Sequence, residues 1–179
     1  MAMKLRMFTH VRTAVPLVLA LLVVFSFAGP APAANAAHHA RFELSDGTVW
    51  DSITRLEWPR TLSPDAGAVT WTAAAGYIDQ LNRDRYLGFD DWRLPAREEL
   101  LSLTEYMKGA GFDGSSTGLS MTDGLRAIGL QGLTGAAYWT SSESRYDQGR
   151  AWAVDLSTGN AGVKDKALTC RVIAVRSAP

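Results

Sequence analysis

The order of its periodic segments is the feature of this sequence that most constrains the fold. Two segments have helical spacing: residues 70–82, with Thr70 suited to the N-cap, and the residues that follow Pro95. The apolar side of the second predicted helix consists of Leu100, Leu103, Thr104 and Met107. Strand-like segments flank the helices, at residues 41–44, 48–51, 56–58, 138–141, 151–156, 161–164 and 168–175. This order predicts an α+β domain in which two helices pack on a twisted antiparallel sheet and the N- and C-terminal strands lie close together, not a parallel βαβ fold.

Turns and irregular segments separate these elements. Residues 48–51 and 56–58 are typical of a hairpin, and a second turn is predicted at residues 159–160. Residues 109–137 are rich in glycine, and we expect irregular structure there with a short helical turn around residues 125–128.

The N-terminal residues have the pattern of a secretory signal peptide. Basic residues come first, the apolar run of residues 13–28 follows, and the small-x-small sequence Ala34-Asn35-Ala36 ends the pattern. We therefore predict a signal peptide over residues 1–36, a flexible mature N-terminus over residues 37–40 and one domain over residues 41–176. The alternative interpretation is an uncleaved N-terminal anchor.

Charge and cysteine content exclude some classes of protein. Without the predicted signal peptide the chain has 15 basic and 18 acidic residues, a net charge of −3, which argues against nucleic-acid binding. Cys170 is the one cysteine, so no intrachain disulfide can form and packing must supply the stability. Six tryptophans are available for that packing, and we expect Trp92 and Trp152 to face inward from strands.

The segment "DDWRLPAREEL", residues 90–100, has two candidate roles. Its acids and arginine suggest a catalytic acid with an arginine clamp, but no nucleophile or histidine is near it in the sequence. The structural interpretation is favoured. Trp92 and Leu94 then point inward, Arg93 points outward or towards Asp91, and the proline fixes the backbone before the second helix.

Other chemical patterns are weak. "GAGFDG" (residues 109–114) resembles a dinucleotide motif but follows a helix, which is the wrong context. The mature histidines, His38 and His39, stand beside the predicted cleavage site, so the domain lacks an imidazole for nucleophilic catalysis. "DGSSTG" (residues 113–118) is better explained as a solvated turn than as a calcium loop, so we predict no metal and no cofactor. The candidate carboxylates for a glycosidase are Asp90, Asp91, Asp113 and Asp123, without specific support.

Five strings of the sequence together resemble a known family. They are "DGTVWDSITRLEW", "TWTAAAGYIDQLN", "DDWRLPAREELLSL", "YWTSSE" and "AWAVDLSTGN…VIAVR", in this order. They are similar to the landmarks of the C-terminal domain of the Lcl collagen-like adhesin, over residues 41–176. The resemblance implies a C-type-lectin-like fold in a secreted or surface-exposed bacterial protein, and binding of sulfated glycans is reported for the adhesin. It does not imply an enzyme.

The sequence departs from the family pattern at several positions. The family usually has threonine-glycine where this chain has Thr54-Arg55, so we expect a different turn type in the first hairpin. Many members have cysteines at the positions of Ile78 and Ala174, and the resemblance implies that apolar packing replaces a bridge here. Cys170 is then a buried or semi-buried free thiol, or the site of an intermolecular bridge.

The second predicted helix has half of a capping box. The family often has a capping residue where this chain has Ala96, whereas Glu99 still occupies the reciprocal position.

We hypothesise a secreted, non-enzymatic module that recognises a glycan or another surface polymer through loops on a rigid scaffold. The C-terminal residues 143–179 carry 6 basic and 4 acidic residues, which favours an acidic or sulfated glycan bound weakly and in a salt-sensitive way. The predicted contact residues are Arg145, Tyr146, Arg150, Lys164 and Lys166, with the two lysines beside the turn at residues 159–160. Self-association into a homo-oligomer would strengthen binding. The alternatives are a structural subunit of a pilus or envelope complex and, less favoured, a polysaccharide hydrolase. We expect the mature protein in the periplasm or at the cell surface, without a stable membrane anchor.

Overall fold

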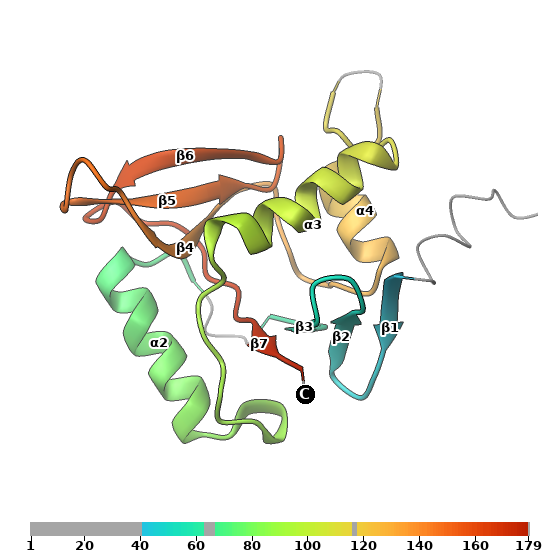
Figure 1. The fold of residues 1–179 in the computed structure, drawn as a ribbon, viewed down its shortest axis with the longest axis horizontal. Coiled ribbons are helices and arrows are strands. Elements are labelled where there is room, and N and C mark those ends of the chain that lie inside the picture. The colour runs from blue at the N-terminus through green and yellow to red at the C-terminus, as the bar shows by residue number, and fades with distance from the viewer. Residues whose placement is uncertain (1–40, 63–66, 116–117, 179) are drawn as a thin grey trace, which may run out of the picture. The chain divides into compact units, whose positions relative to one another are not determined.

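The computed structural model describes residues 41–62, 67–115 and 118–178 (Figure 1). The predicted signal peptide and the predicted flexible residues 37–40 lie outside this part of the chain. The described part contains two antiparallel sheets and three α-helices, which confirms the α+β prediction. No helix within it is long and apolar enough to cross a membrane.

The first sheet joins strands from both ends of the described chain. Its order is β1-β2-β3-β7, formed by β1 (Phe42–Leu44), β2 (Thr48–Asp51), β3 (Leu56–Pro59) and β7 (Arg176–Ser177). β2 and β3 form the predicted hairpin. β7 pairs antiparallel with β3, so the N- and C-terminal strands lie close together as the sequence predicts.

The turn of this hairpin contains a strained residue. Arg55 has φ 56°, in the left-handed region that glycine adopts most easily. Its N–H donates to the Asp51 carbonyl at 2.8 Å, and its own carbonyl accepts from the Ala178 N–H at 3.0 Å. The arginine thus takes a conformation that suits glycine, and the expected change of turn type stays a prediction.

A buried ion pair stands at the end of β2. Asp51 is 1% exposed, and its two carboxylate oxygens accept from the Arg41 guanidinium at 2.8 and 2.6 Å. The same guanidinium lies over the rings of Phe42 and Tyr106. Burial alone would raise the pKa of Asp51, but the hydrogen bonds and the charge of Arg41 outweigh it and the pKa is lowered.

The second sheet has the order β4-β5-β6. Its strands are β4 (Ala137–Glu143), β5 (Arg150–Asp155) and β6 (Asn160–Asp165), all antiparallel. The β4–β5 register shifts between Trp139 and Glu143, whereas the β5–β6 register is continuous. In Figure 1, β6 lies at the outer margin of this sheet.

The predicted strand at residues 168–175 is wrong. This segment makes only single bridges with three different partners: Cys170 with Val69, Arg171 with Tyr138 and Val175 with Arg93. Its residues from Val172 to Val175 are all buried, and alternate ones belong to two different hydrophobic clusters. The segment therefore passes between two cores instead of extending one sheet, which its apolar composition alone does not reveal.

The helices largely follow the predictions. α2 (Trp71–Arg83) is capped by Thr70, whose hydroxyl accepts from the Ala73 N–H at 3.4 Å. α3 (Arg97–Gly109) buries the four predicted side chains, and α4 (Met121–Ala127) begins earlier than the predicted helical turn. A 3₁₀ turn, η1 (Tyr86–Gly88), follows α2.

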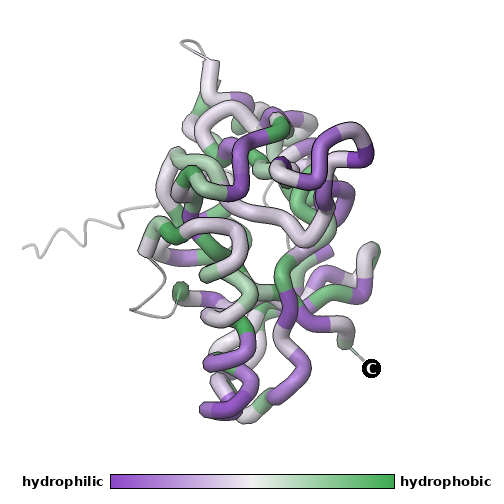
Figure 2. The backbone as a smooth tube through the Cα atoms, turned by 90° about the vertical axis from the view of Figure 1, so that its left-hand side faces the viewer, coloured by the Kyte–Doolittle hydropathy of each residue, from purple (hydrophilic) through white to green (hydrophobic). Residues whose placement is uncertain are grey.

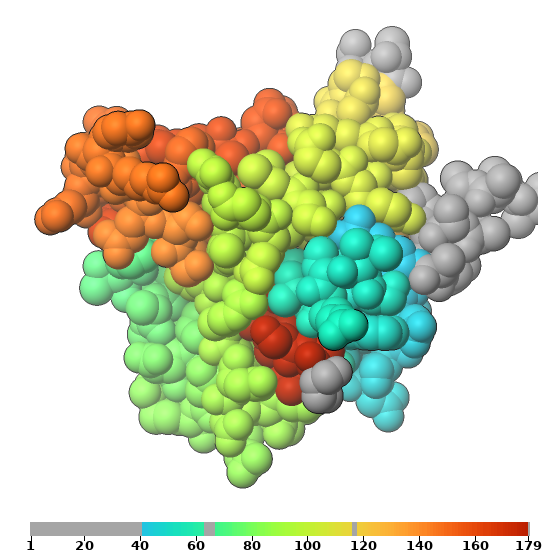
Figure 3. All heavy atoms as spheres, in the orientation of Figure 1, coloured from blue at the N-terminus to red at the C-terminus, as the bar shows by residue number. Residues whose placement is uncertain are grey.

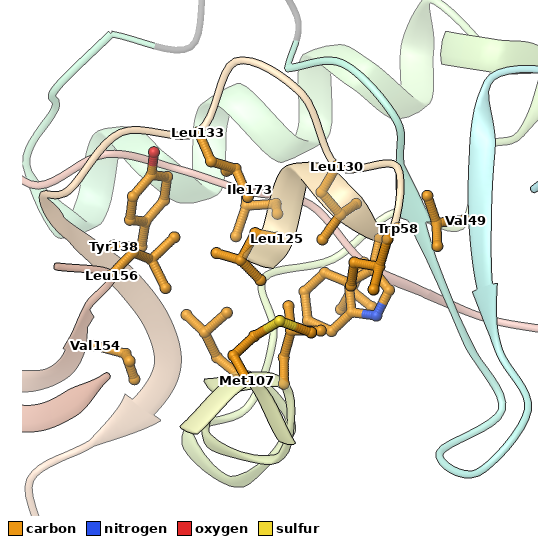
Figure 4. Close-up of a cluster of buried hydrophobic side chains, with 14 of the residues drawn as sticks. Val49, Trp58, Met107, Leu125, Leu130, Leu133, Tyr138, Val154, Leu156 and Ile173 are labelled. Carbon is orange, nitrogen blue, oxygen red and sulfur yellow. The ribbon is translucent and has the colours of Figure 1, made fainter. Parts of the chain in front are cut away.

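Two hydrophobic clusters stabilise the domain. The first contains Trp58, Met107 and Tyr138, and Figure 4 shows side chains from both sheets, α3 and α4 pointing toward one another in it. The second lies between α2 and the other face of the second sheet, and it includes both Ile78 and Ala174. Along the coloured chain of Figure 2, hydrophobic residues occur in short stretches that alternate with hydrophilic ones, as expected where each element buries one side.

The segment before α3 is a structural corner, as favoured. Trp92 and Leu94 are 2% and 8% exposed. The Arg93 side chain is 40% exposed, in line with the expected outward direction, but Asp91 is not its partner. Its guanidinium forms two hydrogen bonds of 2.7 Å with Glu99, whereas Asp91 pairs with Arg176.

Glu99 also fixes the start of α3. Its carboxylate accepts from the Ala96 N–H at 2.7 Å, whereas the methyl side chain of Ala96 returns no hydrogen bond, which confirms the half capping box. Burial alone would raise the pKa of Glu99, but the hydrogen bonds from Arg93 and the Ala96 N–H outweigh it and the pKa is lowered. The corner therefore sets where α3 begins and where its first side chains point.

Candidate functional site

A surface pocket lies where the start of α3 meets the second sheet. Its volume is about 420 Å³, within the range of small-ligand sites. It is lined by Arg97, Glu98, Ser142, Glu143, Ser144, Arg145, Tyr146, Trp152 and Val163, and we call it the Trp152 pocket. Figure 3 shows the segment around residue 145, in orange, next to the yellow-green beginning of α3.

Strand alternation directs Trp152 into this pocket. Its neighbours Ala151 and Ala153 are buried in the cluster beside α2, so Trp152 projects from the opposite face of β5. Val163 of β6 stands opposite Trp152 and projects from the same face. Trp152 is only partly buried, so its predicted place in the core is wrong. The Arg97 guanidinium lies over its ring, 4.4 Å from the centroid.

Arg97 is held in place by its neighbours. Its backbone N–H donates to the Ser142 hydroxyl at 3.0 Å, which ties the first turn of α3 to β4. Its guanidinium donates to the Glu98 carboxylate at 2.6 Å. The corner before α3 thus presents an arginine to the tryptophan ring, a contact that contributes roughly 0.5–1 kcal/mol where exposed.

The loop after β4 presents Tyr146 to solvent. Tyr146 is 100% exposed. The loop backbone is nevertheless fixed, because the Ser144 N–H donates to the Arg150 carbonyl at 3.0 Å and the Tyr146 N–H to the Ser144 hydroxyl at 3.3 Å. The Gly149 N–H also donates to the Asp147 carboxylate, at 2.8 Å. A fully exposed aromatic ring on an ordered turn is a surface available for contact.

The charges around the pocket are nearly balanced. Glu143 accepts from Lys166 Nζ at 2.6 Å, and Glu98 accepts from Arg97. The hydrogen bond from its own backbone N–H, with that from Arg97, lowers the pKa of Glu98, and the nearby charge of Arg145 acts in the same direction. Both carboxyl groups therefore have cationic partners before any ligand arrives.

The structure does not bring the five predicted contact residues together. Arg145 and Tyr146 line the Trp152 pocket, whereas Arg150 pairs with Asp147 at 3.2 Å outside it. Lys164 stands opposite the fully buried Ala151, on the face of the sheet away from Trp152.

The lysines are also not beside the turn at residues 159–160. Lys166 follows the far end of β6, with its ammonium 4.3 Å from the centroid of the Trp71 ring. The lysine at the turn is Lys108 of α3, whose Nζ donates to the Gly159 carbonyl at 3.1 Å. Proximity in the sequence was therefore a poor guide to position.

The other chemical candidates have ordinary surroundings. Within the residues that the structure describes, no cluster of His, Cys, Asp or Glu could hold a metal ion. Asp113 accepts from the Ser115 N–H at 2.9 Å, as in a solvated turn. The remaining acids proposed for a glycosidase have separate arginine partners: Arg85 for Asp90, Arg176 for Asp91 and Arg126 for Asp123.

A second hollow of about 370 Å³ lies between α2 and the corner segment, lined in part by Trp71, Trp92 and Asn82. The Asn82 side-chain amide forms hydrogen bonds with both the N–H and the carbonyl of Trp92, at 2.7 and 2.9 Å, so its polar groups are already used in the fold.

Cys170 is buried at 4% exposure, and burial raises the pKa of its thiol.

The fold and the pocket together define a small α+β domain with two antiparallel sheets and an aromatic, arginine-bearing surface site. Residues 47–176 match the family model of the Lcl C-terminal domain, and the chain belongs to this family, as its sequence strings suggest. Membership associates it with adhesin-like proteins. No curated protein matches the chain.

Proposed function

We propose that this protein is an exported, adhesin-like recognition module that binds a glycan or another surface polymer in the Trp152 pocket. The observation that carries the proposal is the fully exposed ring of Tyr146, held on a hydrogen-bonded turn at the edge of a pocket that also contains Trp152. Family membership supports the adhesin-like part of the proposal.

The chemistry of the pocket suits a sugar. Sugar rings have apolar faces that pack on aromatic rings and hydroxyls that exchange hydrogen bonds with polar side chains. Tyr146 offers an aromatic surface, and Ser142 and Ser144 offer hydroxyls within the same lining. Recognition sites of this kind combine a few placed polar groups with aromatic area.

An acidic or sulfated glycan remains our preferred ligand, with Arg145 and Arg97 in place of the lysines. An anionic group would compete with Glu98 for Arg97, because these two side chains already pair. The balanced charges of the pocket lead us to expect weak binding that depends on salt, since exposed charges are screened over about 8 Å at physiological ionic strength. Nucleic acid is not an expected partner.

We further propose that residues 1–36 direct export, that residues 41–176 form one domain, and that the mature protein acts in the periplasm or at the cell surface. The C-type-lectin-like fold is supported by the pairing of β7 with β3, which joins the ends of the domain in one sheet. Catalysis is not proposed: Glu98 and Glu143, the two carboxyl groups of the pocket lining, already accept hydrogen bonds from Arg97 and Lys166.

The test is a glycan array with the purified protein, followed by affinity measurements on the glycans retained. Tyr146→Ala and Arg145→Ala should each weaken binding by about tenfold or more, typical of a contact residue at an interface centre. Lys164→Ala is the matched control, because it removes a cation from the opposite face of the same sheet and should leave affinity unchanged.

Three results would count against the proposal. An array without any retained glycan removes the ligand class, and a loss of affinity in Lys164→Ala with none in Tyr146→Ala moves the site to the other face. Release of new reducing ends from a bound polysaccharide would favour the hydrolase alternative.

A further inference from the structure

One edge of the second sheet is unpaired in the described part of the chain. β6 bonds only to β5, and no described strand lies beyond it. An edge strand of this length presents a row of backbone donors and acceptors that can pair with another chain. β6 is six residues long and contains no proline.

The register identifies the backbone groups that face outward. The Lys166 N–H donates to the Gly149 carbonyl at 2.9 Å, which makes Lys166 and Gly149 a hydrogen-bonded pair. Hydrogen-bonded pairs alternate with non-hydrogen-bonded pairs along an antiparallel ladder. The backbone of Lys164 therefore forms hydrogen bonds with Ala151, and that of Gly162 with Ala153.

The remaining residues of β6 therefore point their backbone groups away from β5. These are Ala161, Val163 and Asp165. Among the described residues, only the Leu168 N–H bonds to any of these groups, donating to the Asp165 carbonyl at 3.0 Å. A carbonyl has a second lone pair, so this contact leaves an acceptor site on Asp165.

The side chains of this edge are compatible with a second copy of itself. In an antiparallel pair centred on Val163, each Val163 lies opposite the Val163 of the second copy, Asp165 lies opposite Ala161, and Lys164 lies opposite Gly162. No like charges are directly opposed in this register. Shifting one copy along the other, so that its Asp165 lies opposite the Val163 of the second copy, would place the two Lys164 side chains directly opposite each other. Like charges in that position are unfavourable. The centred register also uses all three outward-facing residues.

We propose that β6 is a strand-pairing edge through which two copies of this chain form one continuous six-stranded sheet. Val163 is 36% exposed and gains a direct apolar neighbour in the pair. The twofold axis of such a pair is perpendicular to the sheet, so both copies show the same face on the same side. The two Trp152 pockets then lie on one face, next to a shared pair of Val163 side chains, where a single polymer could reach both.

The inference does not depend on the glycan proposal, since a dimer can form whether or not the pocket binds sugar. Sedimentation equilibrium measures whether the protein dimerises, at concentrations from micromolar to millimolar. The sample is protein purified after expression of the full chain. The expected result is a reversible dimer. Val163→Pro removes an outward N–H that β5 does not use, and it should weaken dimerisation about tenfold or more with the fold retained by circular dichroism. Val163→Thr, which keeps the N–H and the branched shape, is the matched control and should dimerise like the unaltered protein.

Amide hydrogen exchange measured by NMR supplies a readout that needs no variant. The amides of Ala161 and Val163 should exchange fast in dilute samples and become protected as concentration rises, while those of Gly162 and Lys164 are protected throughout by β5. A protein that stays monomeric to millimolar concentration overturns the inference. So does a dimer in which the Ala161 and Val163 amides remain unprotected, or one that Val163→Pro leaves unchanged, because either result assigns the contact to another surface. Protection of these amides only when another protein is added would replace the second copy with a foreign strand and equally overturn it.

Discussion

Replacing Arg55 by glycine should make the domain more stable. Arg55 holds φ 56° in the turn between β2 and β3, and hydrogen bonds on both sides fix it there: its N–H bonds to Asp51 and its carbonyl accepts from Ala178. Its side chain is exposed, so little packing is lost when it is removed. The substitution therefore tests the conformation of the backbone rather than a side-chain contact.

The magnitude follows from two opposing effects at this residue. A left-handed conformation costs a residue with a Cβ atom about 1–2 kcal/mol. Glycine avoids that strain but loses more chain entropy on folding, about 0.5–1 kcal/mol. The expected net gain for Arg55→Gly is about 0.5–1 kcal/mol in the free energy of unfolding, which corresponds to roughly 2–4 °C in Tm.

Urea unfolding of three proteins measures this gain: the unaltered chain, Arg55→Gly and Arg55→Ala. The alanine variant is the matched control, since it also removes the guanidinium but keeps the Cβ atom and hence the strain. We expect the glycine variant to be more stable than the alanine variant, which in turn should be close to the unaltered protein. If the two variants unfold at the same urea concentration, left-handed strain at this turn contributes nothing and the reasoning fails.

Three further predictions concern the corner, two carboxylates that pair with arginine, and the tryptophans. Ala96→Ser should complete the capping box and stabilise the domain by about 0.5–2 kcal/mol in thermal unfolding, and an unchanged or lower Tm would contradict a start of α3 at Arg97. The pKa values of Asp51 and Glu99 are lowered in the folded protein, so their stabilisation is present at neutral pH and is lost as pH falls below about 4. Asp51→Asn should lower stability at pH 7 and flatten this acid dependence, and an equally steep dependence would assign it to other groups. Trp92→Ala should cost about 3–5 kcal/mol in the free energy of unfolding, whereas Trp152→Ala should cost clearly less because its ring is only partly buried; equal losses would place Trp152 in the core after all.

Much of the secondary structure could be predicted because local periodicity and capping decide it. The spacing of apolar residues fixes α2 and α3, and Thr70 marks the start of α2. Residues 168–175 could not be predicted in this way. Their apolar side chains fit a buried strand, yet the segment meets three separate partners, and which partners it meets is set by the packing of both clusters.

The acid that pairs with Arg93 could not be predicted either. Asp91 and Glu99 both lie near it in the sequence, and the first turn of α3 brings Glu99 within 2.7 Å. Asp91 is drawn instead to Arg176, which approaches from β7 at the other end of the chain. A choice between two acids is thus decided by a long-range strand pairing that local sequence does not encode.

The predicted contact residues do not lie together, for a reason that concerns strands in general. Counting charges over residues 143–179 gives a net excess of cations but ignores that successive side chains of a strand leave opposite faces of the sheet. A tight turn ending at Gly159, which has φ 69°, sets the β5–β6 register. That register places Lys164 opposite Ala151 and Val163 opposite Trp152. Lys164 is one residue away from the position opposite Trp152, so the two side chains lie on different faces of the sheet. An anionic ligand held at Lys164 could not touch the Trp152 ring, and this is why the aromatic and cationic parts of the site have to be sought together on the face that Arg97 covers.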